Sequence, residues 1–372
     1  MNPENLTLVK TLRHELHKHP EPSNEETWTK NHLIQFLNTH TQLDIKDRGR
    51  WFYAIYRGKN PHGNVAFRAD FDAILMNENL DIPHASRKPG VAHKCGHDGH
   101  AASLAGLALE IDQLGADHNV FFLFQHAEET GDGAAECVAF INEEDIDEIF
   151  AFHNWSEAPK HAVMVIDGTA HFASRGMTIH LEGVPTHASQ PEYGRNPAYA
   201  VARLISALPE LTSPDHNKGL VLATVIQVAV GERAFGIAAS KGDLLLTIRA
   251  QYEEELDRLQ NELEKLAEQF AKEEGLKVSF SYNDVFPVTS NHAESTEKVR
   301  QVCKKQGRQL IEMEMGFRGS EDFGHYLKQT KGAIFYVGNG EHHPPLHTYE
   351  YDFPDDIIET VVSLFKGLVS LE

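Results

Sequence analysis

Hydrophobic and polar positions alternate in blocks over the first part of the chain. Residues 7–37 have the spacing of a helix, interrupted at the His19-Pro20-Glu21-Pro22 segment. The other blocks predict short strands and one apolar helix: strands at 51–56, 65–69, 120–124 and 149–152, and a helix at 100–114. This alternation is typical of an α/β layer in which helices cover a largely parallel sheet.

The middle of the chain has a different order of elements. We expect strands and helices in the order β-α-β-β-α-β: 177–181, 197–208, 221–230, 244–250, 253–274 and 277–282. This is the order of a ferredoxin-like split βαβ unit. The leucine stripe in 253–274 has helical spacing and fits a core-facing helix, although a short coiled-coil seam is an alternative interpretation.

After Pro287 the α/β character returns, with a helix at 295–306, a strand at 333–337 and a closing helix at 355–371. The fold class we predict is therefore α/β, with a mixed, mostly parallel sheet covered by helices. Residues 1–170 and 286–372 would form one discontinuous α/β domain. Residues 171–285 would form an inserted ferredoxin-like α+β domain.

The amino-acid composition excludes several classes of function and partner. The 372 residues include 55 acidic and 34 basic side chains, which gives a formal net charge of −21. Nucleic acids and anionic membranes need basic patches, so we expect neither as a partner. We also expect no membrane span, no secretory signal and, because there are only three cysteines, no disulfide framework. These features predict a cytoplasmic protein.

Polar clusters follow the predicted strands, where ligands gather in open α/β sheets. Asp70 and Asp72 follow the strand at 65–69. Residues 93–100 read His-Lys-Cys-Gly-His-Asp-Gly-His, and this mixture of thiol and imidazole suits divalent ions such as zinc, cobalt or manganese.

Two glutamates follow the strand at 120–124. On an extended segment the side chains of Glu128 and Glu129 would point in opposite directions, which predicts that one binds metal while the other handles protons. Two single histidines, His153 and His347, stand at a strand end and in a loop.

Taken together, these motifs resemble a known family. The motifs are His93–His100, Gln125–Glu129, Phe152–Trp155, Gly319–Phe323 and Leu346-His347, in this order. They are similar to the aminoacylase-type metallo-amidohydrolases in their cysteine-bearing branch, a group that includes hippurate hydrolase and auxin-conjugate hydrolases. The resemblance covers nearly the whole chain.

The resemblance implies two divalent metal ions per subunit, with zinc, manganese, cobalt and nickel as candidates. The ligands that it implies are Cys95, His97, Glu129, His153 and His347. Cys95 is our candidate for a ligand that bridges both ions. Glu128 would be the general base and acid, and Asp72 would orient a ligand imidazole.

The resemblance also implies that residues 1–170 and 286–372 form the metal-binding catalytic domain, and that residues 171–285 form a lid and dimerisation domain. His187, in the segment Gly183–Pro191, would reach the active site of a partner subunit and polarise the scissile carbonyl, so a homodimer through the inserted domain is implied. Arg249 matches a family arginine that could clamp a substrate carboxylate, with a surface salt bridge as the alternative.

Two positions depart from the family pattern. His126 stands where the family often has proline; a loop substitution and a further ligand are both open. Gly236 stands where the family has a lid asparagine, which puts the usual substrate choice in question.

The function that follows is hydrolysis of the amide bond of an N-acyl amino acid, a small-molecule substrate, by metal-activated water. A dipeptidase or aminopeptidase on the same scaffold is one alternative, and a non-catalytic metal-bearing binding module is another.

Overall fold

A computed structural model describes residues 1–371. The chain divides into two compact units. The first unit contains 1–170, 289–315 and 321–372, and the second contains 171–288 and 316–320. The short segment 316–320, which the sequence analysis placed in the catalytic domain, therefore packs with the second unit.

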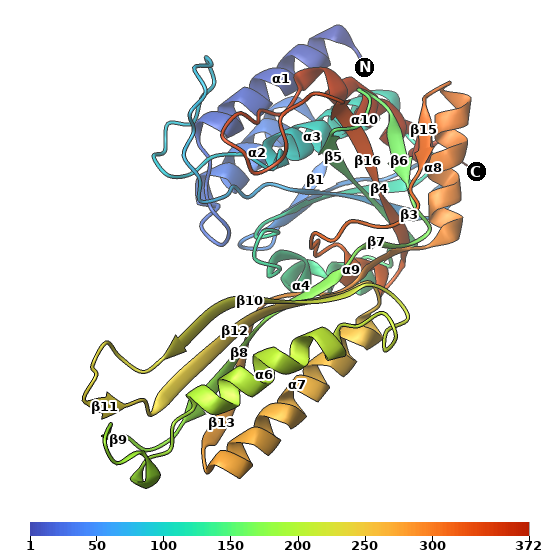
Figure 1. Ribbon diagram of the computed structural model, residues 1–372. Coiled ribbons are helices and arrows are strands. Elements are labelled where there is room, and N and C mark those ends of the chain that lie inside the picture. The colour runs from blue at the N-terminus through green and yellow to red at the C-terminus, as the bar shows by residue number, and fades with distance from the viewer. Residues whose placement is uncertain (372) are drawn as a thin grey trace. The chain divides into compact units, whose positions relative to one another are not determined.

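The first unit is built on an eight-stranded sheet with the order β1-β2-β4-β3-β5-β16-β6-β15 (Figure 1). Its strands are β1 (Asp44–Asp47), β2 (Phe52–Tyr56), β3 (Asn64–Asp70), β4 (Asn119–Gln125), β5 (Glu148–Ser156), β6 (Val163–Val165), β15 (Leu310–Glu312) and β16 (Lys331–Gly340). The central pairs β3–β4, β3–β5 and β5–β16 are parallel, whereas β1–β2 and β2–β4 are antiparallel. The predicted mixed, mostly parallel sheet is confirmed.

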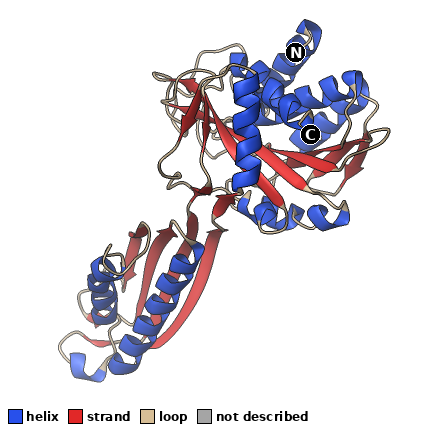
Figure 2. Ribbon diagram, turned by 90° about the vertical axis from the view of Figure 1, so that its right-hand side faces the viewer, coloured by secondary structure: helices blue, strands red, loops and turns tan. Residues whose placement is uncertain are grey.

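Helices cover this sheet (Figure 2). They are α1 (Pro3–Lys18), α2 (Thr27–His40), α3 (His97–Leu114), α4 (Gly133–Cys137), α5 (Phe140–Glu143), α8 (Ala293–Lys305), α9 (Gly324–Leu327) and α10 (Ile358–Val369), the last preceded by the 3₁₀ turn η2 (Asp355–Ile357). Helix α3 packs on β3 and β4 and against α1 and α10. It is buried along most of its length because apolar residues occupy almost every position facing the sheet and the neighbouring helices.

The break that we predict within residues 7–37 is confirmed, since this stretch forms two helices. Residues 19–26 separate α1 from α2, and the prolines at 20 and 22 account for the break. One further two-stranded sheet pairs β7 (Gly168–His171) with β14 (Thr289–Asn291).

The second unit is a four-stranded sheet with the order β10-β12-β8-β13. Its elements are β8 (Ala173–Glu182), β9 (Thr186–His187), η1 (Pro191–Tyr193), α6 (Ala198–Leu211), β10 (Val221–Val230), β11 (Ile237–Ala238), β12 (Lys241–Ala250), α7 (Glu253–Glu274) and β13 (Lys277–Phe286). Strand β12 lies between β10 and β8 and runs antiparallel to both, as a split βαβ unit requires.

Helices α6 and α7 lie side by side along this sheet (Figure 1). The side chains of Leu256, Leu259 and Leu263 on α7 are buried in the core of the second unit. The core-facing interpretation of the leucine stripe is thus confirmed, and the coiled-coil alternative is wrong.

The segment 316–320 joins this unit by backbone pairing. The amide of Phe172 donates to the carbonyl of Phe317 at 3.1 Å. The ring of His171 places Nδ1 3.1 Å from the carbonyl oxygen of Gly319.

Candidate metal centre

The carboxyl ends of neighbouring strands β3 and β4 bring the acidic motifs together. Asp70 is the last residue of β3, and Gln125 is the last residue of β4. Asp72 follows β3 by two residues, and Glu128 follows β4 by three. The two strands are parallel and paired, so both chain segments leave the sheet at one edge.

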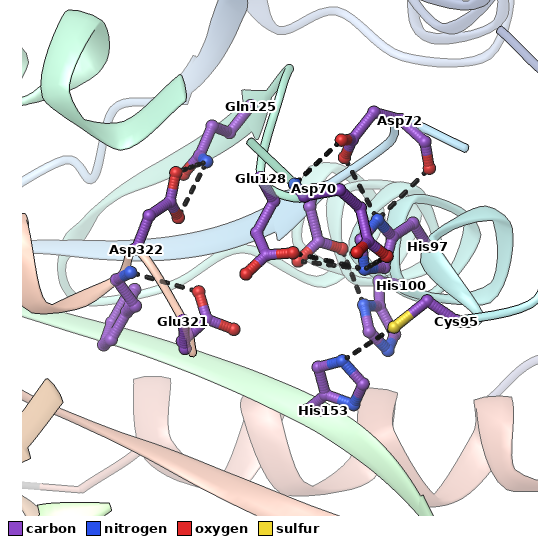
Figure 3. Close-up of polar contacts among 12 residues, drawn as sticks. Asp70, Asp72, Cys95, His97, His100, Gln125, Glu128, His153, Glu321 and Asp322 are labelled. Atoms are coloured by element: carbon purple, nitrogen blue, oxygen red, sulfur yellow. Dashed lines mark hydrogen bonds and ion pairs between the residues drawn. The ribbon is translucent and has the colours of Figure 1, made fainter. Parts of the chain in front are cut away.

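His97, the first residue of α3, is a fully buried imidazole at this edge. Its Nδ1 lies 3.1 Å from both the side-chain Oδ1 and the carbonyl oxygen of Asp72 (Figure 3). Its Nε2 has no hydrogen-bond partner within residues 1–371 although the ring is fully buried. Burying an imidazole nitrogen without a hydrogen-bond partner costs free energy, unless a bound ion or another polar group satisfies the nitrogen.

A thiol and a second imidazole lie next to His97. Sγ of Cys95 is 3.5 Å from Nε2 of His153, which projects from β5 (Figure 3). The other nitrogen of His153, Nδ1, lies 2.7 Å from the carbonyl oxygen of Asn154, so Nε2 is the one that faces the thiol.

Glu128 and Glu129 both face His97. Oε2 of Glu128 and Oε1 of Glu129 each lie 3.8 Å from Nε2 of His97. The prediction that the two side chains point in opposite directions is wrong. Ala127 adopts a positive φ of 47°, and the segment after it is a turn instead of an extended strand, so the alternation on which the argument depended does not apply.

His347 completes the group from a loop after β16. Its Nε2 lies 3.4 Å from Oε1 of Glu129, and its amide donates to the carbonyl of Lys94 at 2.7 Å. Hydrogen bonds with Cys95 and Glu129 raise the pKa of His347 to about 11. The structure thus brings together all seven residues that the sequence analysis placed in this unit: Asp72, Cys95, His97, Glu128, Glu129, His153 and His347.

These residues form overlapping groups with the spacing of metal ligands. Cys95, His97 and His153 offer donor atoms within 4.8 Å of one another, and so do Cys95, Glu129 and His347. Thiolate, imidazole and carboxylate are together a donor set for borderline-soft divalent cations. Cys95 belongs to both groups.

The electrostatics of the site also favour cations. Burial, together with the charges of Glu321 and Glu129, raises the pKa of Glu128 well above its usual range. Burial, followed by the charge of His100, lowers the pKa of His153 well below its usual range. The neutral imidazole, which is the metal-binding form, is therefore favoured at His153. The excess negative charge around Glu128 and the unpartnered nitrogen of His97 fit bound divalent ions.

A buried arginine that the sequence analysis missed organises the acidic residues on one side. Arg68 on β3 donates to Asp70 at 2.6 Å and to Asp322 at 2.7 Å, and it lies 3.1 Å from Glu321. Gln125 also donates to Asp322, at 2.7 Å (Figure 3). The signal was a charged residue inside an otherwise apolar strand, which is rare unless the charge is paired.

The sequence also provides no indication of a chain of hydrogen-bond contacts that runs from Asp70 through His100 to Asn154. Its Nδ1 lies 2.6 Å from Oδ1 of Asp70, and its Nε2 lies 2.6 Å from Oδ1 of Asn154. Both ring nitrogens thus contact protein groups, although His100 also has metal-ligand spacing with Asp70 and His97. Its place in the Cys-Gly-His-Asp-Gly-His string gave no sign of this difference from His97.

The remaining candidate residues belong to none of the groups with metal-ligand spacing among residues 1–371. His126 is buried, and its Nε2 lies 3.3 Å from Glu136; within residues 1–371 it belongs to no group with metal-ligand spacing. His187 and Arg249 belong to the second unit. His187 is exposed on β9, where Nδ1 lies 2.6 Å from Oγ of Ser189. Arg249 donates to the carbonyl of Arg318 at 2.9 Å and to Oγ of Ser320 at 2.8 Å.

Fold and site together define a hydrolase of the metallo-amidohydrolase and peptidase class. The sequence profile of peptidase family M20/M25/M40 matches residues 66–370, and the chain belongs to this family. It is a hydrolase that acts on amide bonds.

Curated relatives match over almost the whole chain. An N-acetyldiaminopimelate deacetylase of Bacillus velezensis is 28% identical over 373 residues, which cover 96% of this chain and 97% of the relative. A hippurate hydrolase of Campylobacter jejuni is 26% identical over 374 residues, which cover 98% and 97%.

Among solved structures, a dinuclear metal-binding M20-family peptidase of Bacillus subtilis superimposes with a TM-score of 0.85 at 23% identity, over 99% of this chain and 98% of that one. This likeness shows the shared fold. Within the described part of the chain, none of the helices has the length and apolar character needed to cross a bilayer.

Proposed function

We propose that the protein hydrolyses the amide bond of an N-acyl amino acid with a water molecule activated at a dinuclear metal centre. The observation that carries the proposal is the position of Glu128. Its carboxylate is buried and lies 3.8 Å from Nε2 of His97, beside the ligand groups. A carboxyl group with a raised pKa in this place is suited to accept and return a proton.

The proposed ligands are Cys95, His97, Glu129, His153 and His347. Cys95 is the proposed bridge between two ions, and its membership of both ligand groups supports this. When bound, divalent ions such as zinc, manganese, cobalt or nickel would supply Lewis acidity that lowers the pKa of water and stabilises an oxyanion.

The chain's own residues would handle the protons and the geometry. Glu128 takes one proton from the attacking water and returns it to the leaving nitrogen, so that an acid and an amine are released. Asp72 holds Nδ1 of His97, which fixes the ring so that Nε2 faces the centre.

The names of the relatives support the substrate class. One is a deacetylase of N-acetyldiaminopimelate and another a hydrolase of hippurate, and both of those substrates are acylated amino acids. Arg249 is the proposed clamp for the substrate carboxylate, because a guanidinium can bind a carboxylate through two hydrogen bonds. Gly236 stands where the resemblance implies a lid asparagine, which leaves the acyl and amino-acid preference open to the substrate panel.

We further propose a homodimer that forms through the second unit. Strand β10 is the edge of its sheet, and most of its residues are exposed, Ile226 at 59% and Val228 at 47%. An exposed apolar edge strand is a template for pairing with a second strand. His187 would then serve the site of the partner subunit.

Mixing two inactive variants tests the role of His187 in the dimer. If His187 acts in the other subunit, dimers reassembled from Glu128→Gln and His187→Ala chains in equal amounts should recover activity in about a quarter of the sites. No recovery would contradict the assignment of His187 to the partner's site.

Cytoplasmic localisation is also part of the proposal. Cys95, Cys137 and Cys303 are all free thiols. Free thiols are typical of reducing compartments.

The decisive experiment is a substrate panel. The protein, loaded separately with Mn²⁺ and Zn²⁺, is incubated with N-acetyl and N-benzoyl amino acids and with free-amine dipeptides, and the products are identified by mass spectrometry. We expect hydrolysis of acylated amino acids that stops on chelation. Preference for free-amine dipeptides would replace the deacylase with a dipeptidase.

A further inference from the structure

The turn that carries Glu128 and Glu129 is held on both sides by carboxylates from distant parts of the chain. The amide of Ala127 donates to Oε1 of Glu26 at 2.7 Å. The amide of Glu129 donates to Oδ2 of Asp72 at 3.0 Å. Glu128 is the residue between these two amides. Its backbone is therefore held by hydrogen bonds to side chains and not by pairing with a neighbouring strand.

The backbone of this turn needs such support. Ala127 has a φ of 47°, a left-handed conformation that residues with a Cβ atom rarely adopt. A strained conformation of this kind persists only where surrounding contacts determine it. On its other side, the carbonyl of Ala127 accepts from the amide of Gly133 at 3.0 Å.

Glu26 is placed for this contact by the segment between α1 and α2. The carboxylate of Glu21 accepts hydrogen bonds from the amides of Trp28 and Thr29, and the carbonyl of Glu21 accepts from the amide of Ala73. In the same segment, the hydroxyl of Ser23 donates to Oδ2 of Asp72 at 2.7 Å. One segment therefore contacts both sides of the turn, through Glu26 directly and through Asp72.

We propose that Glu26 is a positioning residue, which acts through the amide of Ala127 to orient the carboxylates of Glu128 and Glu129. Glu26 is buried, with a relative exposure of 6%. Without this acceptor, the buried amide of Ala127 loses its partner and the turn relaxes toward an ordinary backbone conformation. Both carboxylates would then move away from Nε2 of His97.

The contact needs an oxygen acceptor and does not need a negative charge. Burial and the nearby charge of Asp72 raise the pKa of Glu26 to about 7. A glutamine at position 26 keeps the carbonyl oxygen and resembles the protonated acid, whereas an alanine removes the acceptor.

The test compares Glu26→Gln and Glu26→Ala with the control Glu25→Ala, since the neighbouring Glu25 is 70% exposed at its side chain. Mn²⁺ affinity is measured from the electron paramagnetic resonance signal of the free ion, and kcat and KM are measured on the best acylated substrate. We expect Glu26→Ala to lose about 10–100-fold in Mn²⁺ affinity and in kcat, the range found for groups that orient metal ligands. KM should change little, and Glu26→Gln and Glu25→Ala should stay close to the wild type.

A second variant, Ala127→Gly, allows the proposal to be tested even if Glu26→Ala folds poorly. Glycine adopts a positive φ without strain, so the loss caused by Glu26→Ala should be smaller in an Ala127→Gly background. The proposal is overturned if Glu26→Ala binds Mn²⁺ and turns over like the wild type, or if Glu26→Gln is as impaired as Glu26→Ala.

The inference rests on the proposed metal centre, and on the proposed amide hydrolysis for its kinetic readout alone. A wild-type protein that binds Mn²⁺ but hydrolyses no acylated amino acid would refute the proposed function. The Mn²⁺ affinities of the same variants would still decide the role of Glu26.

Discussion

Oδ1 of Asp72 lies 3.1 Å from Nδ1 of His97, and this contact decides which nitrogen of the imidazole faces the metal centre. The carboxylate is placed to accept a hydrogen bond from Nδ1, so Nε2 is the nitrogen turned toward Glu128 and Glu129. The sequence could place Asp72 after a strand, but only the fold shows that it reaches this ring.

Replacing Glu128 tests the proton-transfer role. Glu128→Gln keeps the size of the side chain but cannot take a proton, so we expect kcat to fall by about 10²–10⁴-fold. Metal content should stay unchanged, because Glu128 is not a proposed ligand. Metal analysis beside steady-state kinetics checks both, and full activity with normal metal content would refute the assignment.

Replacing Cys95 tests the thiolate ligand without any substrate. Protein loaded with Co²⁺ should show a thiolate-to-cobalt charge-transfer absorption, which Cys95→Ser should abolish. Cys137→Ser and Cys303→Ser are the matched controls, since both thiols are also buried but belong to no group with ligand spacing among residues 1–371. An absorption that survives in Cys95→Ser would exclude this thiol as a ligand.

The buried imidazole of His17 predicts a loss of stability in the alkaline range. Nδ1 lies 2.7 Å from Asp98, and Nε2 lies 2.9 Å from Glu78. Burial alone would lower the pKa of His17, but the charge of Asp98 and hydrogen bonds with both carboxylates outweigh it and raise that pKa to about 9. The raised pKa means that the protonated ring stabilises the folded state.

This contribution is complete below pH 6.5, the usual pKa in the unfolded chain, and is lost as the pH rises through about 9. Its size is on the order of 3 kcal/mol. Urea denaturation of chelator-treated protein between pH 6 and 9.5 should show a decline in the wild type that is much smaller in His17→Gln. Equal slopes for the two proteins would contradict the prediction.

A substitution at Gly96, the residue before His97, tests how tightly the segment that carries Cys95 and His97 is packed. The φ of Gly96 is 106°, and a Cβ atom there would lie 2.4 Å from Oδ1 of Asn154. Gly90 also has a positive φ, 79°, but a Cβ atom there meets nothing within 4 Å. Gly90→Ala should therefore cost about 1–2 kcal/mol from backbone strain, and Gly96→Ala should add about 1–3 kcal/mol from overpacking.

Thermal melts of the two alanine variants measure this difference. Similar melting temperatures would show that the contact with Asn154 is relieved by a small local movement.

A charge on the edge of β10 tests the dimer. Ile226→Lys places a cation on the exposed apolar edge, and lysine on edge strands opposes pairing. We expect the variant to be monomeric by analytical ultracentrifugation where the wild type is dimeric. Leu75→Lys is the control, because Leu75 is 79% exposed but lies in the first unit. A dimer that persists in Ile226→Lys would locate the interface elsewhere.

Long periodic elements were predictable from the sequence alone. Helix α7 has the predicted bounds, Glu253–Glu274, because its leucine stripe is regular and Gly275 ends it with a φ of 66°. Short strands such as β6 and β15 were missed, since three residues carry too little pattern and depend on their partners.

The grouping of the candidate ligands was predictable where their residue types are distinctive. Cys95 and His97 stood out because a thiol and an imidazole beside glycines have few structural uses. The shared direction of Glu128 and Glu129 was not predictable, because it depends on the positive φ of Ala127, which its own residue type does not favour. Arg68 was overlooked because its three carboxylate partners come together only in the folded chain.

The pairing of Phe172 with Phe317 limits the modularity of the second unit. An excised fragment 171–288 would lack the acceptor of this backbone bond, because 316–320 stays with the rest of the chain. The same five residues carry both oxygens that fix Arg249. A chimera that exchanges the insert between relatives must therefore transplant two stretches of sequence, and a single graft would separate Arg249 from the groups that hold it.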